Sequence, residues 1–232
     1  MSSVTNNWFT RTFGSSIGKK LLMAGTGLFL TTFLVVHLSG NLQLLKDDQG
    51  RAFNIYSDFM SNNGFIHFVS YGLYFFILLH TVVAIVLTME NKKARPVSYS
   101  VANNQSSWAK RSMGLLGSII LFFIIFHLKD FWAKYKMGWI PYDFEIVNYD
   151  GKDYRDVYKL VFEEFHEMSH LVVYLVSMIV LAFHLNHGFA SAFQTFGINH
   201  KKYTPAIQCL GWAFSIIVPG MFAFLTIFVY LK

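Results

Sequence analysis

The sequence lacks the residues on which many soluble redox and zinc proteins depend. One cysteine, Cys209, among 232 residues excludes a disulfide framework and any cysteine-based zinc or iron–sulfur site. Charged residues make up only 14% of the chain, well below the roughly 25% of soluble domains. Hydrophobic residues make up 54%, phenylalanine alone occurs 25 times, and the mean hydropathy is +0.41. The composition indicates a polytopic membrane protein that folds as a single domain over residues 1–232.

Five apolar segments are each long enough for the roughly 20 helical residues that cross a bilayer. The fold class we predict is therefore an all-α membrane bundle. The first segment follows Lys19 and Lys20, but it is longer than the apolar core of a signal peptide and lacks a small-residue cleavage site. The predicted transmembrane helices are 21–40, 65–89, 112–131, 168–192 and 207–231.

The basic residues are distributed unequally between the two ends of the predicted helices. One side carries ten basic residues against the single acidic Glu90, a net charge of +9, and the other carries a net charge of −3. The positive-inside rule then predicts that the N-terminus is cytoplasmic and the C-terminus outside. The chain's overall charge of +6 is thus a signal for topology, and we expect no nucleic-acid partner. The ten residues are Arg11, Lys19, Lys20, Lys92, Lys93, Arg95, Lys110, Arg111, Lys201 and Lys202.

Two further segments are expected to lie at the membrane surfaces. Residues 1–20 form a cytoplasmic or interfacial N-terminus, in which 7–18 has the apolar residues of an interfacial helix. Residues 132–165 form the one sizeable outer loop, and their Asp150-Gly151 turn predicts a small ordered cap with a hairpin.

Four predicted helices each carry a histidine in apolar surroundings: His37, His80, His127 and His184. An ionisable side chain at membrane depth is costly and suggests a function. A single such histidine is equally consistent with a neutral imidazole hydrogen-bonded to a neighbouring helix. One such histidine on each of four helices favours a role for the histidines as metal ligands.

The depth of each histidine sorts the four into two pairs. His37 lies 17 residues beyond Lys20, about 25 Å from the inner edge at 1.5 Å per residue, and His127 lies 16 beyond Arg111. His80 precedes Lys92 by 12 residues, about 18 Å, and His184 also lies toward the inside. We therefore expect His37 with His127 in the outer half and His80 with His184 in the inner half. Two stacked bis-histidine sites are what two b-type haems require.

Small and aromatic residues near these histidines suit a flat macrocycle. Phe33 and Phe76 precede His37 and His80 by one helical turn, and Gly40 and Gly188 follow His37 and His184. Such residues are also common in ordinary membrane packing.

The segment "SSIGKKLLMAGTGLFLTTFLVVHLSGNL" (15–42) resembles the opening of the dihaem cytochrome b membrane anchor of succinate dehydrogenase and fumarate reductase. The resemblance to the single-subunit, five-helix type extends along the chain through "HTVVAI" and "FHLNHGFASAFQTFG". It implies that His37 and His127 are axial ligands of the distal haem b, and His80 and His184 of the proximal one. In the family motif a glycine follows the ligand by four residues, which selects His184 over His187.

The resemblance also implies the partners. A flavoprotein subunit with covalent FAD interconverts succinate and fumarate, and an iron–sulfur subunit relays electrons to the proximal haem. A quinone, expected to be menaquinone, reacts near the distal haem, where Asn41, His67, Tyr71, Lys129, Asp130 and His170 offer polar groups. The chain would lie in the lipid bilayer of a bacterial cytoplasmic membrane, with no dicarboxylate site of its own.

The sequence departs from the family in two places. The loop between the third and fourth helices is longer than in compact members. Some dihaem fumarate reductases also have a glutamate two residues before the helix 4 ligand, where this chain has Ala182, so a proton path through that group is not implied.

Two other functions compete with this interpretation. Another dihaem anchor, such as that of nitrate reductase, concentrates its ligands on fewer helices. An intramembrane zinc protease would use His166-Glu167-Met168-Ser169-His170, which matches H-E-x-x-H and would place two imidazoles on one helix face. The protease also needs a third ligand, and helix 5 contains no Asp, Glu or His. We expect His166 and His170 to lie at the outer end of helix 4 and to hydrogen-bond the cap to the bundle.

Overall fold

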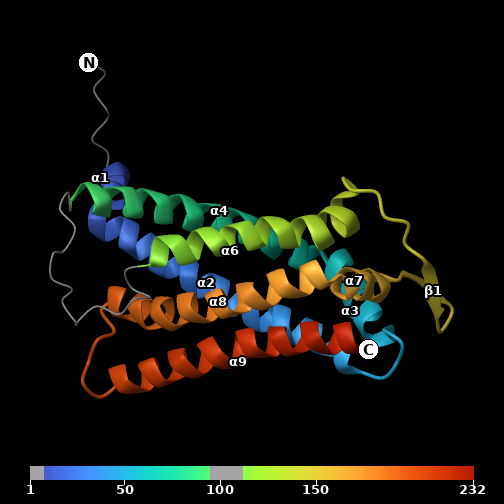
Figure 1. Cartoon of the computed structure of the whole chain (residues 1–232). Helices are drawn as coiled ribbons and strands as arrows, with labels where there is room; N and C mark the ends of the chain where they lie inside the picture. Colours follow the sequence, from blue (N-terminus) through green and yellow to red (C-terminus); the bar gives the residue numbers. More distant parts are fainter. Residues whose placement is uncertain (1–7, 95–111) are drawn as a thin grey trace.

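The computed structural model describes residues 8–94 and 112–232, and five of its helices are long and apolar enough to cross a membrane. They lie side by side as one bundle (Figure 1). Helix α8 packs against α2, α6 and α9, and α2 also packs against α4. The five are α2 (Ser16–Asn41), α4 (Gly64–Lys93), α6 (Met113–His127), α8 (Met168–Thr195) and α9 (Thr204–Leu231).

The outer surface of the bundle is apolar. Phe68 on α4 and Phe122 on α6 are 76% and 64% exposed, and large aliphatic side chains on the same helices are similarly accessible. A soluble protein would rarely leave so many large apolar residues facing water, whereas hydrocarbon chains cover them without cost. The expectation of a multi-pass, all-α membrane protein is therefore confirmed.

The ends of the helices follow local signals in the sequence. The side chain of Asn63 accepts hydrogen bonds from the backbone N–H groups of Phe65 and Ile66, which begins α4. Ser15 caps α2 in the same way through Gly18 N at 3.0 Å. Pro205 stands in the first turn of α9, where its missing N–H is not needed.

Several predicted helix ends are displaced by a few residues, and two of these differences change the description of the cap and of the N-terminus. The third membrane helix does not end at 131, because α6 continues directly into a π-helix, Leu128–Met137, which ends at Gly138 with a φ of +62°. The cap therefore begins six residues later than expected. The predicted interfacial helix is shorter than 7–18, since α1 spans Trp8–Gly14 and Ile17 already belongs to α2; residue 7 lies outside the described residues.

A cap of two helices and a hairpin covers one end of the bundle (Figure 1). It consists of α3 (Arg51–Asn62), β1 (Ile146–Tyr149), β2 (Lys152–Arg155) and α7 (Val157–His166). The hairpin turns at Asp150 and Gly151, whose φ angles of 53° and 83° are those of a two-residue type I′ turn, so this prediction is confirmed. Helix α3 was not predicted.

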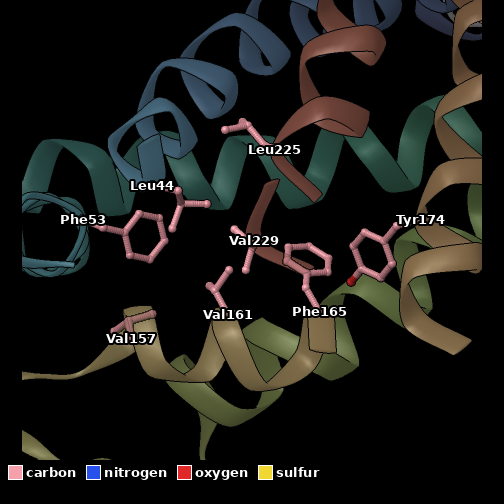
Figure 2. Close-up of a cluster of buried hydrophobic side chains, with 8 residues drawn as sticks. All are labelled: Leu44, Phe53, Val157, Val161, Phe165, Tyr174, Leu225 and Val229. Carbon is pink, nitrogen blue, oxygen red and sulfur yellow. The ribbon is translucent and has the colours of Figure 1, made fainter. Parts of the chain in front are cut away.

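Polar and apolar contacts hold the cap to the bundle. Asn54 on α3 is 1% exposed, donates to Tyr149 Oη and Asp156 Oδ1, and accepts from the backbone N–H of Tyr158. A buried cluster lies where α3, α7, α8 and α9 meet, and Figure 2 shows its side chains facing one another. Its members are Leu44, Phe53, Val157, Val161, Phe165, Tyr174, Leu225 and Val229.

The opposite end of the bundle contains α1 and the turn between α8 and α9 (Figure 1). It carries the described members of the ten basic residues that the positive-inside rule placed on one side: Arg11, Lys19, Lys20, Lys92, Lys93, Lys201 and Lys202. An ion pair between Lys19 and Glu90 joins α2 to α4 there. The C-terminal end of α9 lies beside the cap, so α1 and the C-terminus are at opposite ends. We refer below to the cap end and the basic end. Arg95, Lys110 and Arg111 lie outside the described residues.

Candidate functional site

The first histidine pair lies toward the cap end. The rings of His37 on α2 and His127 at the end of α6 have centroids 5.7 Å apart and planes at 86°. Aromatic rings surround them: Phe33 stacks on His37 at 5.3 Å, and Phe131 lies 5.2 Å from His127. The structure thus brings together two histidines that are far apart in the sequence.

The second pair lies nearer the basic end. The rings of His80 on α4 and His184 on α8 have centroids 6.4 Å apart and planes at 67°. The Oγ1 of Thr26 lies 2.9 Å from His80 Nδ1 and also donates to the carbonyl of Leu22, so it accepts from the ring N–H of His80. His184 Nδ1 is buried and has no hydrogen-bond partner.

Glycines place the two pairs at different levels of the bundle. A Cβ on Gly27 of α2 would lie 3.5 Å from the His80 ring, and one on Gly117 of α6 would lie 3.9 Å from the His184 ring. Each of these glycines precedes the cap-side histidine of its own helix by ten residues. Ten helical residues span about 15 Å, so the two pairs are stacked about that far apart along the bundle.

The glycines and aromatic residues that the sequence suggested have mixed outcomes. Phe33 does lie against His37. A Cβ on Gly40 would instead meet the ring of Tyr56 on α3 at 2.4 Å, so this glycine permits close packing of the cap. Gly188 has no atom within 4 Å of its Cβ position. The glycines beside the histidine rings, Gly27 and Gly117, were missed, although their equal spacing from His37 and His127 is visible in the sequence.

A polar cluster adjoins the cap-side pair. Side-chain ligand atoms of Asp130, Glu164 and His170 all lie within 4.8 Å of one another, the spacing of a metal site. However, Lys129 Nζ lies 3.2 Å from Asp130 Oδ1, and Lys134 forms an ion pair with Glu164. These ammonium groups already supply the positive charge that a cation would bring. The cluster is therefore better described as a neutralised network that joins the π-helix, α7 and α8.

The H-E-x-x-H segment does not form a zinc-protease helix. Helix α7 ends at His166, Glu167 has an extended backbone with ψ of 117°, and α8 begins at Met168. His166 Nδ1 lies 2.8 Å from the carbonyl oxygen of Phe162, whereas His170 faces Asp130 and Glu164. The break at Glu167 removes the i, i+4 relation on which the motif depends. His166 lies on the cap helix, contrary to the expectation that it belongs to helix 4.

The other polar residues considered for quinone binding divide into two groups. Lys129, Asp130 and His170 lie together in the network beside the His37–His127 pair. The remaining three do not join it. Asn41 Nδ2 donates to the backbone oxygen of His37 at 2.8 Å, His67 is held by Ser61 and Lys136, and Tyr71 is 70% exposed.

No model of a protein family, no curated protein and no solved structure matches this chain. The assignment of a function therefore depends on the residues and their arrangement.

Proposed function

We propose that this chain is the membrane-anchor cytochrome b of a succinate dehydrogenase or fumarate reductase, and that it passes electrons between an iron–sulfur subunit and a membrane quinone. The observation that carries the proposal is the arrangement of four histidines, one on each of four helices. They form two pairs, which lie at two different levels of an apolar bundle.

The separation of the rings fits a metal held between them. An imidazole nitrogen binds a transition metal at about 2.0–2.1 Å, so two imidazoles on opposite sides of one metal have centroids about 6 Å apart. The observed separations are 5.7 and 6.4 Å. Each ring plane contains its own metal–nitrogen bond, and rotation about that common axis leaves the angle between the rings free. Angles of 86° and 67° would therefore allow both imidazoles of a pair to bind one metal.

The hydrogen bonds of the second ring nitrogens of His80 and His127 are also those expected of metal ligands. A ligating histidine usually donates its second ring N–H to a protein oxygen, which sets its tautomer. His80 Nδ1 has Thr26 Oγ1 in this role, and His127 Nδ1 has Tyr174 Oη at 3.3 Å. All four histidines are only partly covered by the chain although they stand inside membrane spans, as a slot for a macrocycle requires.

The four histidines would hold two b haems: His37 and His127 the distal one, His80 and His184 the proximal one. Haem iron saturated by two imidazoles supplies one-electron transfer rather than oxygen chemistry. The chain's own contribution is to orient the imidazoles, to set the spacing of the two levels and to exclude water with the surrounding aromatic side chains.

The assignment to the succinate dehydrogenase and fumarate reductase family rests on the resemblance of residues 15–42 and on the distribution of one ligand per helix over four helices. The basic end would then face the bacterial cytoplasm, where the iron–sulfur subunit and the FAD-bearing flavoprotein dock. The cap end would face outward, with menaquinone reacting in the outer half beside Lys129, Asp130 and His170.

A reduced-minus-oxidised spectrum of the purified protein, with haem quantitation, tests the proposal. Two b haems per chain are expected, together with co-purification of a flavoprotein and an iron–sulfur protein that supports succinate-dependent quinone reduction. A chain without haem would overturn the cytochrome assignment. Two haems with a different catalytic partner would retain the cytochrome and reject the family.

A further inference from the structure

The hydroxyl of Tyr174 on α8 lies between a histidine and a buried carboxylate. Tyr174 Oη donates to Asp130 Oδ2 at 3.1 Å and lies 3.3 Å from His127 Nδ1. A phenol has one proton to donate, and here Asp130 accepts it. The second contact therefore has the opposite sense, with His127 Nδ1–H donating to Tyr174 Oη. The order of the chain is imidazole, phenol, carboxylate.

Asp130 is an unusual residue for its position. It lies within a predicted membrane span, in the π-helix that follows α6, and is 0% exposed. Burial of a carboxylate costs several kcal/mol unless donors compensate it. Two donors reach it, Tyr174 Oη and Lys129 Nζ, the latter at 3.2 Å. These two donors satisfy the buried oxygens of the carboxylate.

The other charged groups around Asp130 come from the cap and from α8. His170 Nε2 lies 3.6 Å from Asp130 Oδ2 and 3.3 Å from Glu164 Oε2, and Glu164 is paired with Lys134. Asp130 is thus the end of this network that reaches toward the histidine pair, and Tyr174 is its only link to His127 among the described contacts.

We propose that Tyr174 and Asp130 are positioning residues that lower the electron affinity of the haem held by His37 and His127. The inference rests on the proposed function. A hydrogen bond from the outer nitrogen of a ligating imidazole to a protein oxygen raises the basicity of the ligand. The Tyr174 oxygen is a stronger acceptor than an isolated hydroxyl, because Asp130 accepts the proton of that hydroxyl and polarises it. A more basic ligand stabilises the ferric form over the ferrous form, because the ferric iron carries the greater charge. The same bond fixes the ring so that Nε2 is the nitrogen left to bind.

The other histidine pair lacks this arrangement, so an effect of Tyr174 and Asp130 on one haem can be distinguished from an effect on both. His80 Nδ1 donates to Thr26, a neutral hydroxyl whose own proton goes to the carbonyl of Leu22. No carboxylate among the described residues stands behind Thr26 in the way that Asp130 stands behind Tyr174. Changes at Tyr174 or Asp130 should therefore act on one haem only.

The test is a redox titration of both haems in the complete complex, carrying Tyr174→Phe or Asp130→Asn. Each change should favour the ferrous form of the cap-side haem by a factor on the order of ten, which for one electron is a rise of about 59 mV. The other haem should keep its midpoint potential. The electron paramagnetic resonance signal of the ferric cap-side haem should also shift or broaden in Tyr174→Phe, because the His127 ring is no longer fixed.

Tyr142→Phe is the matched control. It removes the same hydroxyl from a tyrosine that also donates to a carboxylate, Glu163 Oε2 at 2.7 Å, but in the cap and away from either histidine pair. Both potentials should stay unchanged in this variant.

Two results would overturn the inference while leaving the proposed function intact: unchanged potentials of both haems in Tyr174→Phe, or equal shifts of both. If Asp130→Asn fails to assemble, Tyr174→Phe decides alone, since it keeps the ring that packs in the buried cluster. Absence of haem from the wild-type chain is a separate result that rejects the proposed function itself.

Discussion

The rings of His80 and His184 lie 6.4 Å apart between centroids, although the two residues are 104 positions apart in the chain. The relation of His37 to His127 is similar, at 5.7 Å and 90 positions. Because the members of each pair come from different helices, removing either imidazole should empty the same site.

Single substitutions of the four histidines should therefore fall into two classes. His37→Ala and His127→Ala should each lose the cap-side haem, and His80→Ala and His184→Ala the other. Haem quantitation and redox titration of the purified variants distinguish the classes. His200→Ala, in the turn at the basic end, serves as a control that should keep both haems. Loss of the same haem from His37→Ala and His80→Ala would refute the pairing.

Thr26 orients the His80 ring, so its hydroxyl should matter to one haem. Thr26→Val keeps the shape of the side chain and removes the acceptor of His80 Nδ1–H. Loss of such a partner typically weakens metal affinity by about 10–100-fold, and we expect easier loss of the His80–His184 haem during purification or on mild denaturation. Thr26→Ser restores the hydroxyl and should behave as wild type. An unaffected haem content in Thr26→Val would show that the bond does not orient the ligand.

The broken H-E-x-x-H segment should not support zinc chemistry. Elemental analysis of the purified protein should find no stoichiometric zinc, and His166→Ala and His170→Ala should each retain both haems. His170→Ala should at most change quinone turnover, because His170 belongs to the network beside the cap-side pair. One zinc per chain that disappears in His170→Ala would revive a metal function for this segment.

The cap should depend on Asn54. Its side chain is buried and serves three partners, so Asn54→Ala takes one partner from each of three part-buried groups: Tyr149 Oη, Asp156 Oδ1 and the N–H of Tyr158. Each such group costs about 1–3 kcal/mol, and the cap should open more readily than the bundle. Limited proteolysis should cut the variant at residues 138–166 faster than wild type, with haem content preserved. Asn62→Ala, which removes an exposed bond within α3, is the control.

Much of the membrane architecture was predictable because its causes are local. A helix crosses a bilayer if about 20 successive residues are apolar, and that requirement can be read from any one segment alone. The five spans are confirmed, and the two-residue turn at Asp150 and Gly151 is confirmed because positive φ angles at both positions favour such residues. The depth argument also grouped the four histidines as the structure groups them in space, while their role as haem ligands stays a prediction.

Several features that were missed depend on contacts between distant segments. Helix α3 is held by hydrogen bonds from Asn54 to residues about 100 positions away in the chain. The break at Glu167 separates α7, which belongs to the cap, from the membrane helix α8. Depth measured from charged residues placed the two histidine levels about 7 Å apart, whereas the glycines beside the rings give about 15 Å, because helices begin and end at different heights.

By itself, the sequence determined the number of spans, the asymmetry of charge and the presence of one histidine in apolar surroundings on each of four helices, because apolar length and charge act within a segment. The tertiary structure alone decided that Tyr174 bridges His127 and Asp130. It also decided that His170 faces Asp130 whereas His166 contacts the carbonyl oxygen of Phe162. Those relations require side chains from α6, α7 and α8 to meet, and where helices meet depends on the packing of the whole bundle.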